Sequence, residues 1–268
     1  MTQSEEPTVS VSVDARGIAT VMLDRPHRNN AYNGQMIDEL LAGLPALAED
    51  PSVRVVVLRG NGKHFQAGAD LAWIQQVREL DEAGNVDVSR RTTRAVHGLT
   101  MLGKPTVALV HGGCFGGGTG IIAACDVVIA DRSAMFSITE ARWGLIATPI
   151  VPQLLSRIGP GRLRRYSLTC ERFGADRAFD IGLVDEVCDV GELDETAAPI
   201  LDGLLHCPPE ALAQSKAAAL QYAGLQFSDD EMEDMARPHG LKRMGAEADE
   251  GLRSFLEKRK PSWYPGTG

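Results

Sequence analysis

FGGGTGIIAACD, residues 115–126, contains three adjacent glycines and no acidic or basic residue before Asp126. Three adjacent glycines follow a strand-like segment, Pro105–Gly112, and precede a run of small apolar residues that suits the start of a helix. Glycine permits unusual φ angles and lets a ligand approach the backbone closely. Free N–H groups at a helix start attract negative charge. The stretch therefore predicts a turn whose backbone binds a ligand, although a tight turn or close packing would require the same glycines.

Strands and helices alternate on both sides of this turn. Residues 9–26, VSVSVDARGIATVMLDRP, alternate around a central turn and predict a hairpin. The β-branched segments Ser52–Gly60 and Cys125–Asp131 predict buried strands. Apolar residues recur at helical spacing in Asn33–Glu49 and Arg90–Leu102. This interleaving predicts an α/β architecture.

The character of the chain changes near residue 200. Ala211–Tyr222 and Met232–Lys258 contain few strand formers and predict helices. The 268 residues suffice for one large domain with a helical appendage. We therefore expect a core over residues 1–200 and a helical region over 201–268.

Composition excludes several classes of protein. A net charge of -9 disfavours a nucleic-acid partner, although a local basic patch could still bind phosphate. Apolar runs are far shorter than the roughly 18 residues that a membrane span needs, and the polar N-terminus does not resemble a signal peptide. The five cysteines form no CxxC pair, so we expect reduced thiols, a cytoplasmic location and no metal site.

A second small-residue turn lies upstream, in KHFQAGADLAWI, residues 63–74. Its AGAD segment, residues 67–70, follows the strand Ser52–Gly60, as the glycine run follows its own strand. Two such turns can direct two backbone N–H groups at one carbonyl oxygen. The pair therefore predicts an oxyanion hole made without side chains.

Glu140 is the candidate acid–base group. It lies in MFSITEARWGLIATP, residues 135–149, among mostly apolar neighbours. A carboxyl group in apolar surroundings has a raised pKa and can exchange protons near neutrality. A surface position, or a salt bridge with Arg142, is the alternative interpretation.

Four motifs occur in a characteristic order: RPHRNNAY (25–32), HFQAGADL (64–71), FGGGTGIIAACD (115–126) and FSITEARWGLI (136–146). In this order they resemble the enoyl-CoA hydratase/isomerase (crotonase) superfamily, and the match extends from about Asp14 to the FLEKRKPSW ending. The AGADLAW turn, the ERFGADRAFDIGLVDEV segment and that ending most resemble bacterial methylglutaconyl-CoA hydratases of leucine degradation.

The resemblance implies a crotonase-like spiral of repeated ββα units with a C-terminal helical trimerisation region. The implied assembly is a homotrimer or a hexamer made of two trimers. The implied partner is an acyl-CoA thioester substrate. Coenzyme A is then part of the substrate, and no separate cofactor is expected.

The resemblance also implies roles for particular residues. The thioester oxygen would lie between the N–H groups of Ala69 and Gly117, with Glu140 as the catalytic residue. Further substrate-binding positions would be Asp70, Leu71, Gly116, Gly120 and Trp143. Coenzyme A would contact His27 and Arg28, together with Phe255 and Lys258 from the helical tail of a neighbouring subunit.

The chain departs from the well-studied hydratases at one position. Those enzymes carry a first glutamate in a GGGxE pattern, where this chain has Gly120, and keep a second that corresponds to Glu140. One carboxylate can still complete a syn hydration by taking a proton from water and returning it to the α-carbon. We expect a hydratase of a branched, 3-methylglutaconyl-CoA-like substrate. A Δ3,Δ2-enoyl-CoA isomerase and a non-catalytic CoA-binding relative remain alternatives.

A glutaconyl-type substrate carries a distal carboxylate, which requires a cation or hydrogen-bond donors. Charge alone makes five arginines candidates for that contact: Arg78, Arg90, Arg91, Arg94 and Arg142.

Overall fold

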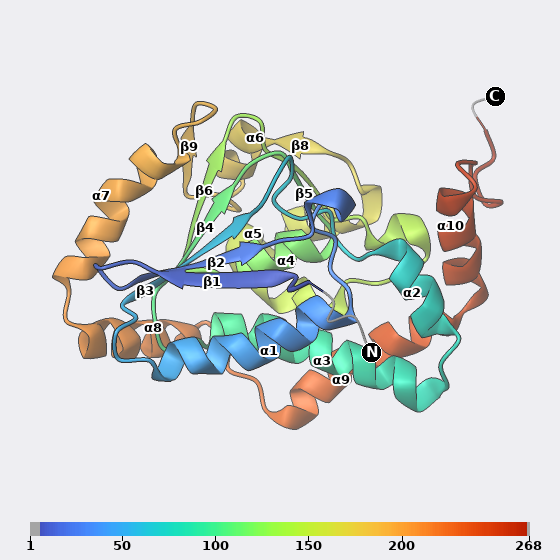
Figure 1. Ribbon diagram of the computed structural model, residues 1–268. Helices are drawn as coiled ribbons and strands as arrows, with labels where there is room; N and C mark the ends of the chain where they lie inside the picture. The colour runs from blue at the N-terminus through green and yellow to red at the C-terminus, as the bar shows by residue number, and fades with distance from the viewer. Residues whose placement is uncertain (1–5, 267–268) are drawn as a thin grey trace.

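The computed structural model describes residues 6–266 and contains two sheets (Figure 1). The main sheet has the order β1-β2-β3-β4-β6-β9, and the second has the order β5-β7-β8. In the main sheet β1 pairs antiparallel with β2, and the other neighbours are parallel. The strands are β1 (Val9–Val13), β2 (Ile18–Leu23), β3 (Val55–Gly60), β4 (Thr106–Val110), β5 (Gly113–Phe115), β6 (Val127–Asp131), β7 (Met135–Ser137), β8 (Phe173–Gly174) and β9 (Glu186–Cys188).

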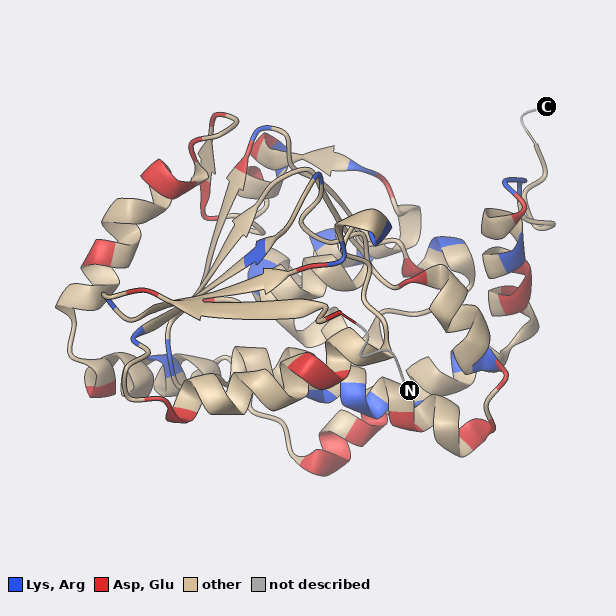
Figure 2. Ribbon diagram, in the orientation of Figure 1, with Lys and Arg blue, Asp and Glu red and all other residues tan. Residues whose placement is uncertain are grey.

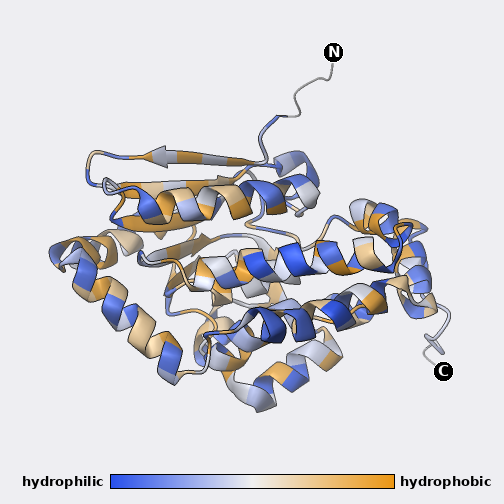
Figure 3. Cartoon of the chain, turned by 90° about the horizontal axis from the view of Figure 1, so that it is seen from below, coloured by the Kyte–Doolittle hydropathy of each residue, from blue (hydrophilic) through white to orange (hydrophobic). Residues whose placement is uncertain are grey.

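Helices cover both faces of the main sheet. In Figure 1, α1, α3 and α9 lie below it, and Figure 3 shows the same three helices side by side. On the other face, Leu193 and Ala197 of α7 pack against Val55, Val107 and Ile129. The helices are α1 (Gly34–Glu49), α2 (Leu71–Arg78), α3 (Glu82–Thr100), α4 (Gly117–Ala123), α5 (Val151–Thr169), α6 (Ala175–Asp180), α7 (Leu193–His206), α8 (Pro209–Tyr222), α9 (Asp229–Met244) and α10 (Ala246–Leu256), with 3-10 turns η1 (Pro26–Arg28), η2 (Glu140–Trp143) and η3 (Thr148–Ile150).

One supersecondary unit repeats along the chain. A strand of the main sheet leads into a short extended segment and then into a helix, as in β4–β5–α4 and β6–β7–η2. After β3 the extended segment is residues 65–70, which forms isolated bridges between Ala69 and Tyr32 and between Gln66 and Cys114. The short segments therefore lie next to one another at the ends of the main strands. This arrangement confirms the predicted α/β fold of repeated strand–strand–helix units.

The predicted elements are found with shifted ends. The hairpin is β1–β2, with Val11 opposite Val21. Helix α1 begins where Asn33 accepts a hydrogen bond from the Met36 N–H, an N-cap that stabilises a helix start. The helix expected from residue 90 begins earlier, at residue 82, because Asp81 caps it.

The C-terminal region is helical, as predicted, but it begins before residue 200. Helix α7 runs across that position, and the long helix expected over residues 232–258 is divided at Gly245 into α9 and α10. Helix α10 packs directly on η2, since a Cβ on Gly251 would overlap the backbone of Trp143. The last helix therefore supports the turn that carries Glu140.

Charged residues lie mainly on helices and loops, and the strands of the main sheet carry few of them (Figure 2). Within residues 6–266, no helix is long and apolar enough to cross a membrane. Over the same range, His, Cys, Asp and Glu side chains form no group of three that could hold a metal ion.

Candidate active site

The glycine run brings the start of α4 against two other segments. Gly116 has a φ of 51°, and a Cβ there would lie 2.9 Å from both Oε1 of Glu140 and Oγ1 of Thr139. A Cβ on Gly117 would lie 2.7 Å from the Tyr32 ring. Such distances are shorter than normal contacts between heavy atoms. The glycines are therefore needed so that the backbone can lie against Glu140 and Tyr32.

Two backbone N–H groups remain unpaired at this place. The N–H of Tyr32 donates to the Gly68 carbonyl, and the N–H of Asp70 donates to the Tyr32 carbonyl, both at 2.9 Å. This parallel bridge leaves the N–H of Ala69, the residue opposite Tyr32, pointing away from the bridge. Gly117 is the first residue of α4, so its N–H has no acceptor within the helix. Neither N–H finds a backbone or side-chain acceptor in residues 6–266.

The two turns are held in contact. The Gln66 N–H donates to the Gly113 carbonyl at 3.1 Å, and the Phe115 N–H returns a bond to the Gln66 carbonyl at 2.9 Å. A Cβ on Gly68 would lie 3.0 Å from the Phe115 oxygen. The segments that carry Ala69 and Gly117 are thus joined by backbone hydrogen bonds.

Asp70 was predicted to bind substrate, and it does line the larger cavity at the site. Its carboxylate, however, already has partners in the protein. It caps α2 by accepting hydrogen bonds from the N–H groups of Ala72 and Trp73, and it forms a salt bridge to Arg25 at 3.2 Å. Asp70 therefore stabilises the turn that presents the Ala69 N–H.

Glu140 opens η2 and presents a buried carboxylate oxygen. The residue as a whole is half-buried, but its Oε2 atom is buried and has no hydrogen-bond partner within the described chain. Burial raises the pKa of Glu140 to about 7, although the backbone N–H groups of Glu140 and Thr139 oppose the rise. The alternative salt bridge is wrong, because Arg142 donates to the Cys170 carbonyl at 3.0 Å. Glu140 can therefore exchange a proton near neutral pH.

Gly120 of α4 packs against Ile150 of η3. It is buried, and a Cβ on it would overlap the side chain of Ile150. It lines neither cavity at the site, and its assignment to substrate binding stays a prediction. Ile150 fills the space that a side chain at residue 120 would need, which leaves Glu140 without a second carboxylate from α4.

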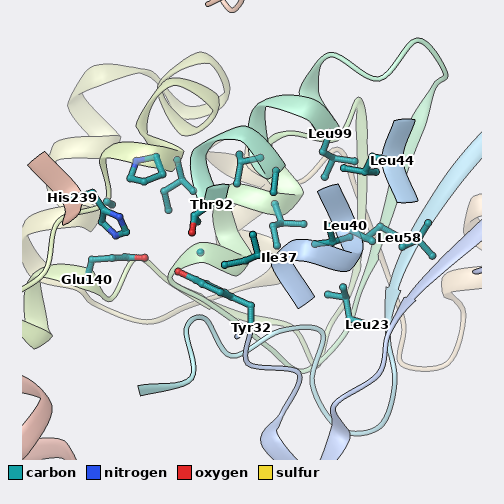
Figure 4. Close-up of a pocket in the computed structure, with 18 of the residues that line it drawn as sticks. Leu23, Tyr32, Ile37, Leu40, Leu44, Leu58, Thr92, Leu99, Glu140 and His239 are labelled. Atoms are coloured by element: carbon teal, nitrogen blue, oxygen red, sulfur yellow. The ribbon is translucent and has the colours of Figure 1, made fainter. Parts of the chain in front are cut away.

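Two cavities meet at Glu140, and Tyr32 and His239 also line both. The smaller cavity, of about 50 Å³, is apolar and extends between the sheet and helices α1 and α3. Figure 4 shows Glu140, Tyr32 and His239 at one end of it and leucines at the other. The larger cavity, of about 430 Å³, is lined by most of the predicted site residues: His27, Arg28, Ala69, Asp70, Leu71, Gly116, Glu140, Trp143 and Phe255.

The outer part of the larger cavity combines aromatic and basic side chains. Trp143 and Phe255 form an edge-to-face pair with ring centroids 4.9 Å apart. Phe255 belongs to α10 of the same chain, whereas the resemblance placed it in a neighbouring subunit. Lys258 does not line the cavity, and its contact with coenzyme A stays a prediction. Three exposed arginines also line the cavity: Arg28, Arg142 and Arg172.

The residues at the site that were not predicted include Tyr32, His239 and Arg243. Burial, followed by the charge of Glu140, raises the pKa of Tyr32 to about 12, so its hydroxyl stays protonated. Burial, with a smaller effect of Arg243, lowers the pKa of His239 to about 3, so its ring stays neutral. Tyr32 ends the RPHRNNAY motif, and that position was the available signal for it.

Comparisons with known proteins agree with this geometry. The sequence profile of the family "Enoyl-CoA hydratase/isomerase" matches residues 14–265. A crotonyl-CoA hydratase from Syntrophomonas wolfei is 31% identical over 252 residues, which cover 92% of this chain and 94% of the relative. A peroxisomal delta(3,5)-delta(2,4)-dienoyl-CoA isomerase from Arabidopsis thaliana is 29% identical over 252 residues, 90% of each chain.

A solved structure gives the same result. The crystal structure of an enoyl-CoA hydratase from Mycobacterium avium matches with a TM-score of 0.84 and 32% identity, and the match covers 96% of this chain and 99% of that one. The chain therefore belongs to the enoyl-CoA hydratase/isomerase family. Its architecture is the crotonase fold expected from the motifs.

Proposed function

We propose that this protein is a hydratase that adds water reversibly to an α,β-unsaturated acyl-CoA thioester. The observation that carries the proposal is Glu140, a carboxyl group with a pKa near 7, in a cavity next to two unpaired backbone N–H groups. Membership of the family supports it. The reaction needs no redox step, so no cofactor other than the coenzyme A of the substrate is required.

The two N–H groups would act on the thioester carbonyl. If its oxygen accepts hydrogen bonds from Ala69 and Gly117, electron density moves from the double bond toward that oxygen, and the β-carbon becomes electrophilic. Donors fixed by backbone structure stabilise the enolate without reorganising. The two N–H groups must therefore be held in fixed positions, and the backbone hydrogen bonds between the two turns hold them.

Glu140 would transfer the proton. Its carboxylate takes a proton from water as the oxygen bonds to the β-carbon, and it returns that proton to the α-carbon on the same face. One carbon–oxygen bond and one carbon–hydrogen bond form, while the π bond and one O–H bond of water are broken. A pKa near 7 suits a group that must act first as a base and then as an acid.

Tyr32 is placed to help with the water. Figure 4 shows its hydroxyl and the Glu140 carboxylate pointing toward one another across the cavity. Because the hydroxyl stays protonated, it can donate a hydrogen bond to the attacking water. We assign Tyr32 this positioning role, which a second carboxylate would perform in relatives that have one.

Isomerisation is the second candidate, since the single carboxylate of Glu140 could also move a proton from the α-carbon to the γ-carbon. The similarity to a dienoyl-CoA isomerase keeps this candidate open. A 3-enoyl-CoA substrate separates the two reactions, because an isomerase converts it to the conjugated product without adding water. A CoA-binding protein without catalysis would turn over neither substrate.

The finer assignments rest on the sequence motifs. We propose a branched substrate of the 3-methylglutaconyl-CoA type, and the small apolar cavity next to Glu140 offers room for an apolar branch. We also propose a cytoplasmic homotrimer or hexamer, assembled through residues 201–268. Sedimentation of the purified protein tests the assembly, and a monomer would contradict it.

The decisive experiment is the hydration of crotonyl-CoA and 3-methylglutaconyl-CoA by wild type and by Glu140→Gln. We expect turnover by wild type and a loss of about 10²–10⁴-fold in kcat for the variant. Glu195→Gln, an exposed change on α7, is the matched control and should leave kcat unchanged. Binding of both thioesters by wild type without turnover of either would refute the proposal.

A further inference from the structure

Arg243 of α9 is a buried cation with uncharged partners. Arg243 as a whole residue is only 1% exposed to solvent. Nη1 donates to the carbonyl and to Oδ1 of Asn85 at 3.2 and 3.4 Å, and Nη2 contacts Ser89 Oγ at 2.9 Å and His239 Nδ1 at 3.4 Å. Nε has no partner in the described part of the chain. No carboxylate of residues 6–266 forms a salt bridge with this guanidinium.

Such a charge is unfavourable unless something compensates it. A buried ion is stable when a counter-charge and good hydrogen bonds replace its lost water. Burial lowers the pKa of Arg243 only to about 10, so the group is still a cation at neutral pH. Three other arginines with little exposure are paired with carboxylates, namely Arg25, Arg78 and Arg157, with side-chain exposures of 11–13%.

The position of Arg243 shows where a counter-charge can enter. Arg243 lines the larger cavity, together with Glu140 and Ala69. Its charge lowers the pKa of Tyr32, and the charge of Glu140 raises it, so Tyr32 lies within electrostatic range of both groups. The pKa of Glu140 itself is set by its burial and by backbone N–H groups, without a contribution from Arg243. Arg243 also contacts His239 Nδ1 at 3.4 Å, and His239 lines both cavities together with Glu140.

The arginines chosen from the sequence do not fill this role. Arg78, Arg90, Arg91 and Arg94 form salt bridges with Asp249, Glu233, Asp38 and Asp229, and they line neither cavity. Arg142 lines the larger cavity but is exposed. Exposed arginines at the mouth suit the phosphates of coenzyme A, whereas Arg243 is deep in the protein.

We propose that Arg243 binds a second carboxylate, carried by the acyl group of the substrate at the end remote from the thioester. The carboxylate would accept a hydrogen bond from the unpaired Nε–H and supply the missing counter-charge. This inference rests on the proposed function, because it assumes that an acyl-CoA occupies the cavity. It makes Arg243 the residue that selects substrates with a charged acyl end.

The rival interpretation is that Arg243 only links α3 to α9 and that the apolar cavity takes a neutral acyl chain. Two saturated thioesters that cannot react separate these interpretations: glutaryl-CoA and the same thioester with its terminal carboxylate converted to an amide. We expect wild type to bind glutaryl-CoA about 10–100-fold more tightly than the amide, the range for a hydrogen bond to a charged group. Calorimetry measures both affinities.

Variants then assign the preference to one residue. Arg243→Gln should abolish the preference, whereas Arg90→Gln, which breaks a different α3–α9 contact to Glu233, should keep it. Equal affinities of wild type for glutaryl-CoA and its amide would overturn the proposal, and this result does not depend on whether Arg243→Gln folds. A preference for glutaryl-CoA that survived in a folded Arg243→Gln would overturn it as well. Failure of wild type to hydrate any enoyl-CoA would instead refute the proposed function, and the affinity ratio would still test Arg243.

Discussion

Replacing Glu140 by Gln should change how stability depends on pH. The pKa of Glu140 is raised from 4.5 to about 7 in the folded protein. Between these pH values the folded state binds more protons than the unfolded state, so the stability of wild type falls as pH rises. Below about pH 4.5 the group carries no penalty, and above about pH 7 the full penalty is present. The amide of the Glu140→Gln variant cannot ionise, so the variant should lack this fall.

The size of the effect follows from the same pKa. Each pKa unit corresponds to about 1.4 kcal/mol, so the rise from 4.5 to about 7 is worth at most about 3.5 kcal/mol. Glu140 as a residue is only half-buried, and solvent screening at its exposed part reduces this figure. We therefore expect the free energy of unfolding of Glu140→Gln, relative to that of wild type, to be about 1–3 kcal/mol higher at alkaline pH than at acidic pH.

Urea denaturation of both proteins at about pH 5 and about pH 8 measures the gain. Glu195→Gln, at an exposed position, is the control and should show no pH-dependent difference from wild type. A difference between Glu140→Gln and wild type that is the same at both pH values would contradict the buried carboxyl group. The activity of wild type supplies a second check, since kcat/KM for hydration should rise with a midpoint near pH 7.

Three further substitutions test other parts of the site. Gly120→Ala should destabilise the protein by about 1–3 kcal/mol in urea denaturation, because its Cβ overlaps Ile150, and a smaller residue at 150 should restore part of the loss. Asp70→Ala removes a helix cap and a salt bridge, so it should cost about 1–2 kcal/mol and also lower kcat/KM; unchanged kinetics would show that the Ala69 turn does not depend on it. Phe255→Ala opens the contact with Trp143 and should raise KM for acyl-CoA about tenfold with kcat retained, the pattern of lost uniform binding.

The sequence predicted the features that depend on the backbone and on near neighbours. The strands, the two small-residue turns and the raised pKa of Glu140 follow from β-branched runs, glycines and apolar flanks. All of them are visible within a window of a few residues. They are also the features that the motif resemblance covers, so both lines of reasoning agreed on them.

The features that the sequence did not predict depend on packing between distant segments. Helix α9 is rich in charged residues, and a buried arginine in such a helix looks the same as a solvated one. Arg243 is buried because α9 packs tightly on α3, where a Cβ on Gly240 would lie 2.9 Å from the Asn85 carbonyl oxygen. The sequence likewise showed that residue 120 is not an acid. It did not show that Ile150, thirty positions later, fills the space that a side chain at residue 120 would need.

The packing of α10 on η2 also determines when the site can form during synthesis. A Cβ on Gly144 would overlap the backbone of Glu247, so the turn after Glu140 and the start of α10 fit against each other directly. Chains fold from the N-terminus as the ribosome makes them, and α10 is made about a hundred residues after η2. The strands of the main sheet can pair while the chain is still growing, but Glu140 reaches its final surroundings only once α10 has emerged. A nascent chain that still lacks α10 thus lacks the backbone contact that supports the turn after Glu140.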